Sequence, residues 1–190
     1  MSASSEPIEV DPRPRDLITP ESLLLVHTGH GKGKSSSAFG VMIRGIAHDW
    51  NVGVIQFVKS GDWNVGEEKI GRQLGVEWHS LGSGFTWDSN NIEQDKSIAQ
   101  ESWAKAETLL HSGRFQLLIF DELTYLLNWS WVDTDHVVTV LKKRPAHVNV
   151  VVTGRDAPEE LLAIADTVTE MRNVKHAYQS GYKALRGVDF

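Results

Sequence analysis

The chain has no cysteine among its 190 residues. Disulfide bonds, thiolate metal sites and cysteine nucleophiles are therefore all excluded. It also has no apolar run close to the roughly 18 residues that a membrane-spanning helix needs, and no N-terminal apolar stretch that resembles a signal peptide. We therefore expect a cytoplasmic protein with no membrane partner.

Positive charge is scarce as well. The chain has 19 lysines and arginines against 25 aspartates and glutamates, which gives a net charge of −6 at pH 7. A nucleic-acid partner favours a basic face, so this balance argues against one. The one short basic cluster, Lys142 to Arg144, follows an apolar stretch and fits the solvated end of a helix, where cations complement the dipole.

Regular structure is expected only after the first 21 residues. Residues 1–21 hold four of the six prolines, mixed with charges and serines, and predict a flexible tail. Residues 22–190 have the length and the 41% hydrophobic content of one domain with a full-sized core. Strands are expected at 23–28, 52–58, 76–80, 115–120, 148–153 and 167–171. Helices are expected at 34–47, 91–111, 133–143 and 158–165. Near-continuous apolar strands separated by helices indicate an α/β fold with a mostly parallel sheet covered on both faces.

The most informative segment runs from Thr28 to Ser36 and reads Thr-Gly-His-Gly-Lys-Gly-Lys-Ser-Ser. A glycine-rich turn between a buried strand and a helix lets backbone N–H groups turn inward around phosphates, and the helix N-terminus adds about half a positive charge. Lys34 adds a full charge, and Ser35 places a hydroxyl where it can ligate magnesium. We therefore predict a P-loop (RecA-like) nucleotide site. Its phosphate-binding residues would be Gly29, His30, Gly31, Lys32, Gly33, Lys34, Ser35 and Ser36.

The spacing of this loop departs from the usual P-loop. The common motif would need glycine at position 28, where this chain has Thr28, so that the loop counted from Gly29 is one residue short. A phosphate cradle is still expected, but ordinary handling of a γ-phosphate does not follow from it.

Further candidates lie where other predicted strands end, because ligands collect at the carboxyl ends of a parallel sheet. Asp121 and Glu122 follow an apolar strand and predict a metal-binding carboxylate, although the sequence does not say which of the two ligates directly. As an alternative, the pair could cap a helix. Arg155 follows a strand and a glycine, where a guanidinium could neutralise phosphate. Arg44, ten residues past Lys34, could do the same or form a surface salt bridge.

Five motifs together resemble one family, the ATP:corrinoid adenosyltransferases of the CobA/CobO type. The resemblance extends from about residue 23 to residue 190. The motifs are Thr-Gly-His-Gly-Lys-Gly-Lys-Ser at 28–35, Gly-Phe-Thr-Trp at 84–87, Asp-Glu-Leu-Thr-Tyr at 121–125, Val-Thr-Gly-Arg at 152–155 and Val-Lys-His-Ala-Tyr at 174–178. The tail does not obviously match the helical extension found in some members.

The resemblance implies a reaction and its parts. The 5′-deoxyadenosyl group of ATP would move to the cobalt of a reduced corrinoid, with release of triphosphate. ATP would be bound in reversed orientation with Mg²⁺ (or Mn²⁺), and Lys34 and Glu122 would be the catalytic residues. Phe85 and Trp87 would press an apolar wall against the lower corrin face and so ease reduction of the cobalt. A flavodoxin-like reductase would supply the electron, and the enzyme would be a homodimer.

Two other classes of protein remain open from the residues alone. A P-loop ATPase or kinase acting on the γ-phosphate would use Glu122 to position water. A non-catalytic, nucleotide-dependent module would present Trp63, Trp87 and Trp129 to a protein partner. The short loop and the Gly-Phe-Thr-Trp segment argue against both.

Overall fold

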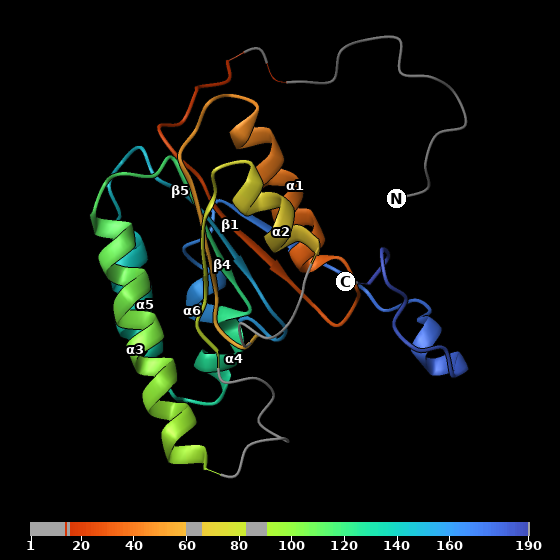
Figure 1. The fold of residues 1–190 in the computed structure, drawn as a ribbon. Coiled ribbons are helices and arrows are strands. Elements are labelled where there is room, and N and C mark those ends of the chain that lie inside the picture. The colour runs from red at the N-terminus through yellow and green to blue at the C-terminus, as the bar shows by residue number, and fades with distance from the viewer. Residues whose placement is uncertain (1–13, 15, 60–65, 83–90, 190) are drawn as a thin grey trace, which may run out of the picture.

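A six-stranded sheet forms the centre of the molecule (Figure 1). The computed structural model describes residues 14, 16–59, 66–82 and 91–189. The strand order is β3-β2-β4-β5-β1-β6, and every pair of neighbours is parallel. The strands are β1 (Leu24–Thr28), β2 (Val52–Gln56), β3 (Glu77–Ser80), β4 (Leu117–Asp121), β5 (Asn149–Thr153) and β6 (Thr167–Glu170). The predicted α/β fold with a parallel sheet is confirmed.

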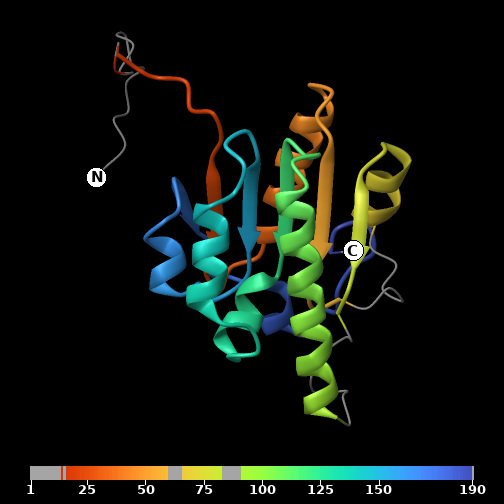
Figure 2. The ribbon, with the colours of Figure 1, turned by 90° about the vertical axis from the view of Figure 1, so that its left-hand side faces the viewer.

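Helices cover both faces of this sheet, as Figures 1 and 2 show. The helices α1 and α2 lie on one face, and α3 and α5 lie on the other. The helices are α1 (Lys34–Ile46), α2 (Gly66–Gln73), α3 (Ile92–His111), α4 (Leu123–Asn128), α5 (Thr134–Lys142) and α6 (Glu159–Leu162), followed by a short 3-10 helix at Ala177–Ser180. Among the described residues, no helix is both long and apolar enough to cross a membrane.

The four central strands β1, β2, β4 and β5 are largely apolar because each buries side chains on both faces. In β4, Leu118 and Phe120 pack in the larger core cluster, together with residues of α3 and α5. Leu117 and Ile119 alternate with them and pack in the smaller cluster with Phe39 of α1. This two-sided burial explains why the strands could be predicted as continuous apolar runs.

Two helices were not predicted, and both offer few residues from which a period can be read. In α2, Ile70 is the one large apolar side chain among eight residues, and only Gly71 is buried. The six residues of α4, Leu-Thr-Tyr-Leu-Leu-Asn, include three leucines, and four of the six are buried. A run of six residues is too short to be assigned to a helix by period. The predicted helix at 158–165 is shorter in the structure, at Glu159–Leu162.

Candidate active site

Three polar side chains form a hydrogen-bonded row where neighbouring strands end. Gln56, Asp121 and Thr153 are the last residues of β2, β4 and β5. The Thr153 hydroxyl donates to Asp121 Oδ1 at 2.8 Å, and Gln56 Nε2 donates to Asp121 Oδ2 at 3.0 Å. The Asp121 side chain is fully buried. Both of its oxygens thus accept hydrogen bonds from the sheet itself, which makes it an anchor of this edge.

Glu122, the next residue, does not continue the strand but begins a turn. Its φ of 65° lies in the left-handed region, which costs a residue with a side chain roughly 1–2 kcal/mol. The turn is held by its backbone N–H, which donates to Thr153 Oγ1 at 2.9 Å. Burial, and then the neighbouring charge of Asp121, raise the pKa of Glu122 to about 7, although Lys59, Lys34 and Arg155 oppose this shift.

The glycine-rich loop packs tightly on the backbone that follows β6. The Gly31 N–H donates to Met171 O at 2.6 Å. A Cβ added at Gly29 or Gly31 would lie only 2.6 or 2.7 Å from that same oxygen, and Gly29 and Gly33 have φ values of 89° and 116°. Side chains are therefore excluded at these positions. Lys34 Nζ reaches back across the loop to donate to Gly31 O at 2.7 Å.

A polar cavity of about 210 Å³ opens beside this loop. Its lining includes four cationic and three acidic side chains, together with the N-terminal turn of α1, whose first N–H groups have no intrahelical acceptor. The lining residues are Lys32, Gly33, Lys34, Ser35, Ser36, Phe39, Lys59, Glu67, Glu122, Tyr125, Arg155 and Asp189. This combination of positive charge and helix N-terminus suits a polyphosphate.

The residues predicted for this site divide into two groups. Seven of them line the cavity: Lys32, Gly33, Lys34, Ser35, Ser36, Glu122 and Arg155. The other five lie elsewhere. Gly29 and Gly31 shape the loop, His30 is exposed and pairs with Asp156 at 2.9 Å, and Arg44 is exposed in the last turn of α1. Asp121 is the buried anchor described above.

Arg155 is held at the cavity by a close approach of two backbone segments. Gly154 has a φ of 143°, and a Cβ there would lie 2.0 Å from the Thr124 hydroxyl oxygen. That hydroxyl donates to the Arg155 carbonyl at 2.6 Å, as does Asn128 Nδ2 at 3.1 Å. These two hydrogen bonds from α4 fix the backbone of the turn, and the Arg155 side chain lines the cavity.

The cations of the cavity differ in their surroundings. Burial, and then the positive charge of Arg155, lower the pKa of Lys34, while Glu122 and other acids oppose this shift. Lys32 is paired with Asp189, near the C-terminus, with Nζ–Oδ1 at 2.5 Å. Lys59 Nζ lies 3.8 Å from Asp121 Oδ2.

Several lining residues were not singled out from the sequence. Phe39 lies on α1, five residues past Lys34, and Tyr125 ends the Asp-Glu-Leu-Thr-Tyr motif. Lys59, Glu67 and Asp189 lie in other segments, and the fold brings them to the same cavity. Phe85 and Trp87, and likewise Trp63, lie outside the described residues.

A metal ion would have few protein ligands here. In the described ranges, no group of three or more His, Asp or Glu side chains could hold a metal ion. Ser35 and Glu122 nevertheless line one cavity. Magnesium bound with a nucleotide uses one or two protein ligands, completed by phosphate oxygens and water, so this donor set fits it.

The parallel sheet, the glycine-rich loop at the start of α1 and the cationic cavity define a P-loop nucleotide-binding protein. Comparison with known proteins gives the family. The family model described as ATP:corrinoid adenosyltransferase BtuR/CobO/CobP matches residues 20–190. The chain therefore belongs to the ATP:corrinoid adenosyltransferases, which confirms the resemblance noted in the sequence, and it is a transferase that uses ATP and a corrinoid as substrates.

Individual relatives agree with this assignment. A corrinoid adenosyltransferase of Pseudomonas aeruginosa is 44% identical over 170 residues, which cover 88% of this chain and 83% of the relative. A corrinoid adenosyltransferase of Escherichia coli is 38% identical over 182 residues, which cover 96% of this chain and 92% of the relative. The reading as a P-loop ATPase or kinase is not favoured.

Proposed function

We propose that the polar cavity binds the triphosphate of ATP and neutralises it as it leaves, while the 5′-deoxyadenosyl group passes to the cobalt of a reduced corrinoid. The observation that carries this proposal is the gathering of four cationic side chains around the N-terminus of α1, where the strands end. In the transfer, the electron pair of cob(I)alt forms the cobalt–carbon bond at C5′. The C5′–oxygen bond breaks, and its electron pair leaves on the triphosphate.

Charge stabilisation is then the main task of the protein. Cob(I)alt is itself the nucleophile, so the reaction needs no nucleophilic side chain and no general base. The leaving group gains negative charge, and preorganised cations are the groups that stabilise such charge best. Lys34 and Arg155 are placed for this role, and Lys32 can join them if it exchanges Asp189 for a phosphate oxygen.

The division of labour between the two acids supports Glu122 as the metal ligand. Asp121 is buried with both oxygens bonded to the sheet, whereas Glu122 lines the cavity with Ser35. We assign Ser35 and Glu122 to Mg²⁺. When bound, the cation would screen the triphosphate and favour its departure.

The corrinoid side of the site rests on Phe85 and Trp87. We propose that they form an apolar wall that excludes a lower axial ligand, because four-coordinate cobalt accepts an electron more readily. Phe85→Ala and Trp87→Ala should then slow the reaction that starts from cob(II)alamin far more than the one that starts from prereduced cob(I)alamin. Equal losses in the two assays would contradict this role and leave only corrinoid binding.

The same chemistry requires a partner that supplies an electron. Reduction to cob(I)alt needs a strong one-electron donor, for which we propose a flavodoxin-like reductase. We also propose a homodimer in the cytoplasm, with residues 22–190 as the catalytic domain; most of the tail of residues 1–21 lies outside the described residues.

The decisive experiment is anaerobic. The protein is mixed with ATP, magnesium and prereduced cob(I)alamin while the visible spectrum and the phosphate products are followed. A light-sensitive adenosylated corrinoid together with triphosphate is the expected result. ADP and phosphate with unchanged corrinoid would instead indicate an ATPase, and no nucleotide chemistry would indicate a binding module.

A further inference from the structure

The polar row at the sheet edge continues to a fourth strand, β1. His27 lies one residue before the end of β1 and is aligned in register with Thr153 of β5, just as Gln56 is aligned with Asp121. The histidine is buried. Side chains alternate between the two faces of a strand, and Leu25, two residues earlier, packs in the smaller core cluster with residues of α1. His27 therefore faces the start of α1.

His27 meets this helix at Ser37 and at the Lys34 carbonyl. Its Nδ1 lies 2.7 Å from Ser37 Oγ and 3.4 Å from Lys34 O, and Ser37 Oγ lies 2.8 Å from the same carbonyl oxygen. The serine has one hydroxyl proton, so only one order of donors satisfies all three contacts. The ring N–H at Nδ1 donates to Ser37 Oγ, and the hydroxyl donates to Lys34 O. With the ring proton on Nε2 instead, the Nδ1 lone pair would face that carbonyl.

The carbonyl that receives these bonds belongs to the peptide group between Lys34 and Ser35. The N–H of the same peptide group is among the first N–H groups of α1, which have no intrahelical acceptor. Hydrogen bonds donated to a carbonyl polarise its peptide group and strengthen the N–H as a donor. His27 and Ser37 thus hold the backbone from which Lys34 and Ser35 reach the polar cavity.

We propose that His27 is a positioning residue for adenosyl transfer, which acts through Ser37 on the peptide group between Lys34 and Ser35. This inference rests on the proposed function, because it takes the polar cavity as the triphosphate site. His27 is not among the residues that line that cavity. A fixed ammonium and a polarised N–H stabilise the leaving triphosphate, which gains negative charge, more than they stabilise bound ATP. Loss of His27 should therefore lower kcat more than it raises KM for ATP.

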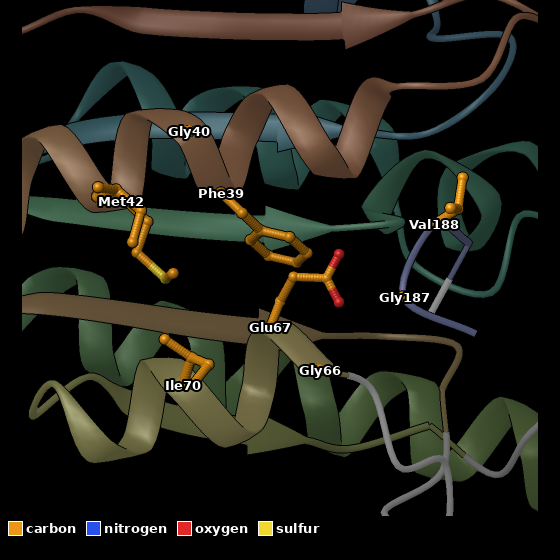
Figure 3. A pocket seen from close by; sticks show the side chains of 9 residues that line it. Phe39, Gly40, Met42, Gly66, Glu67, Ile70, Gly187 and Val188 are labelled. Atoms are coloured by element: carbon orange, nitrogen blue, oxygen red, sulfur yellow. The ribbon is translucent and has the colours of Figure 1, made fainter. Parts of the chain in front are cut away.

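Ser37 can be changed without disturbing the opposite side of α1. There, Phe39 and Met42 line a cavity of about 450 Å³ between α1 and α2, and Figure 3 shows both side chains pointing toward α2. At about 3.6 residues per turn, Ser37 lies roughly 200° around the helix from Phe39. Alanine is also the residue that favours a helix most. Ser37→Ala should therefore remove the hydroxyl and leave the helix and its packing on α2 intact.

The tautomer of His27 is tested first, on the ligand-free protein. Isotopic labelling of the histidine ring nitrogens lets NMR report which of them carries the proton, at a mildly alkaline pH where histidine is neutral. The signals of His27 are identified as those that His27→Leu lacks. We expect the proton on Nδ1. A proton on Nε2 would overturn the proposal, because the ring could then not donate to Ser37.

The effect on catalysis is measured anaerobically with ATP, magnesium and prereduced cob(I)alamin. We expect Ser37→Ala and His27→Leu each to lower kcat at least about tenfold, with KM for ATP within about threefold of wild type, because small displacements of positioning groups cost up to about 10²-fold. The double variant should be no slower than the slower single variant, since the two residues act as a unit. His27→Asn, whose amide N–H can replace the ring N–H, should return kcat to within about threefold of wild type.

Thr108→Ala on α3 is the matched control. Its hydroxyl also donates to a helix carbonyl, Ala104 O at 2.9 Å, but it is exposed on a helix that covers the other face of the sheet. This variant should have the kcat of wild type.

Three kinetic results would overturn the proposal. Both single variants could keep kcat within about twofold of wild type. Their losses could multiply in the double variant, which would mean that the two residues act independently. His27→Asn could be as slow as His27→Leu, which would mean that the donor is not what matters. A wild-type protein that transfers no adenosyl group would instead remove the proposed function, and the role of His27 with it, whichever tautomer is found.

Discussion

Removal of the Thr153 hydroxyl is the sharpest test of the row of polar residues at the sheet edge. This side chain is fully buried, and its oxygen does two things. It donates to Asp121 Oδ1 at 2.8 Å, and it accepts the Glu122 N–H at 2.9 Å. Thr153→Val keeps the shape of the side chain and its preference for a strand, but it leaves both partners without this bond.

The expected loss is large because Thr153 and Asp121 are fully buried, so that solvent does not readily replace the hydroxyl. A hydrogen bond to a charged group contributes about 1.5–3 kcal/mol, and a buried N–H left unpaired costs about 1–3 kcal/mol. We therefore expect Thr153→Val to lower the free energy of unfolding by about 3–5 kcal/mol. That is a substantial part of the roughly 5–15 kcal/mol that stabilises an ordinary domain.

Urea denaturation of the ligand-free protein at pH 7 measures this difference. Thr169→Val in β6 is the matched control, because it makes the same change at an exposed strand position. The control should stay within about 0.5 kcal/mol of wild type. A loss below about 1 kcal/mol for Thr153→Val would refute the reasoning, since the hydroxyl would then not hold Asp121 and Glu122 together.

Three further predictions concern the loop, the arginine turn and pH. Lys34→Ala should lower kcat by about 10²–10³ with the unfolding midpoint retained, because it removes charge from the leaving group; unchanged turnover would exclude the loop from the mechanism. Gly154→Ala places a Cβ 2.0 Å from the Thr124 hydroxyl oxygen, so thermal denaturation should show a loss of at least about 2 kcal/mol, and a wild-type midpoint would contradict the close approach. Burial lowers the pKa of His27 below its ordinary 6.5. The unfolded chain therefore takes up a proton that the folded protein resists, and stability should fall as the pH drops below 6.5. His27→Gln should flatten this dependence between pH 7 and pH 5, and an unchanged slope would argue against it.

Much of the fold could be predicted because its signals are local. Strands β1, β2, β4 and β5 are recognisable as apolar runs and β6 by its β-branched residues, and α3 shows apolar side chains at helical spacing over its 20 residues. The stop at Gly113 follows from its positive φ of 65°. The helices α2 and α4 were not predicted, because α2 has one large apolar side chain and α4 has only six residues, too few in each case to show a period.

The site could be predicted only where one segment carries the chemistry. The loop from Gly29 to Ser36 could be predicted as a phosphate-binding loop because its glycines, lysines and serines stand in the order of a known motif. Lys59, Glu67 and Asp189 reach the same cavity from three distant segments, and no pattern within any of them points to a phosphate. Arg44 lies on α1 as expected, but it is in the last turn of that helix and is not among the residues that line the cavity.

The acid pair shows why adjacency in sequence does not settle a role. Asp121 still belongs to the strand, so its side chain meets the donors of the neighbouring strand ends. Glu122 begins a left-handed turn, so its carboxylate goes to the cavity instead. A sequence cannot distinguish these two outcomes, because they depend on the register that aligns Gln56 with Asp121 across the sheet.

The same pair of acids also suggests why binding of a polyanion with its cation would stabilise this site. Glu122 combines an unfavourable backbone conformation with a carboxyl whose pKa is raised to about 7, so the ligand-free protein holds this residue at a cost. Such strain persists only where the surrounding structure enforces it, and here the Thr153 hydroxyl and the buried Asp121 do so. A cation bound between Glu122 and the phosphates would relieve the repulsion between the two acids. If Glu122 binds magnesium as proposed, the substrate complex compensates this cost, and we therefore expect magnesium and ATP together to stabilise the fold more than either does alone.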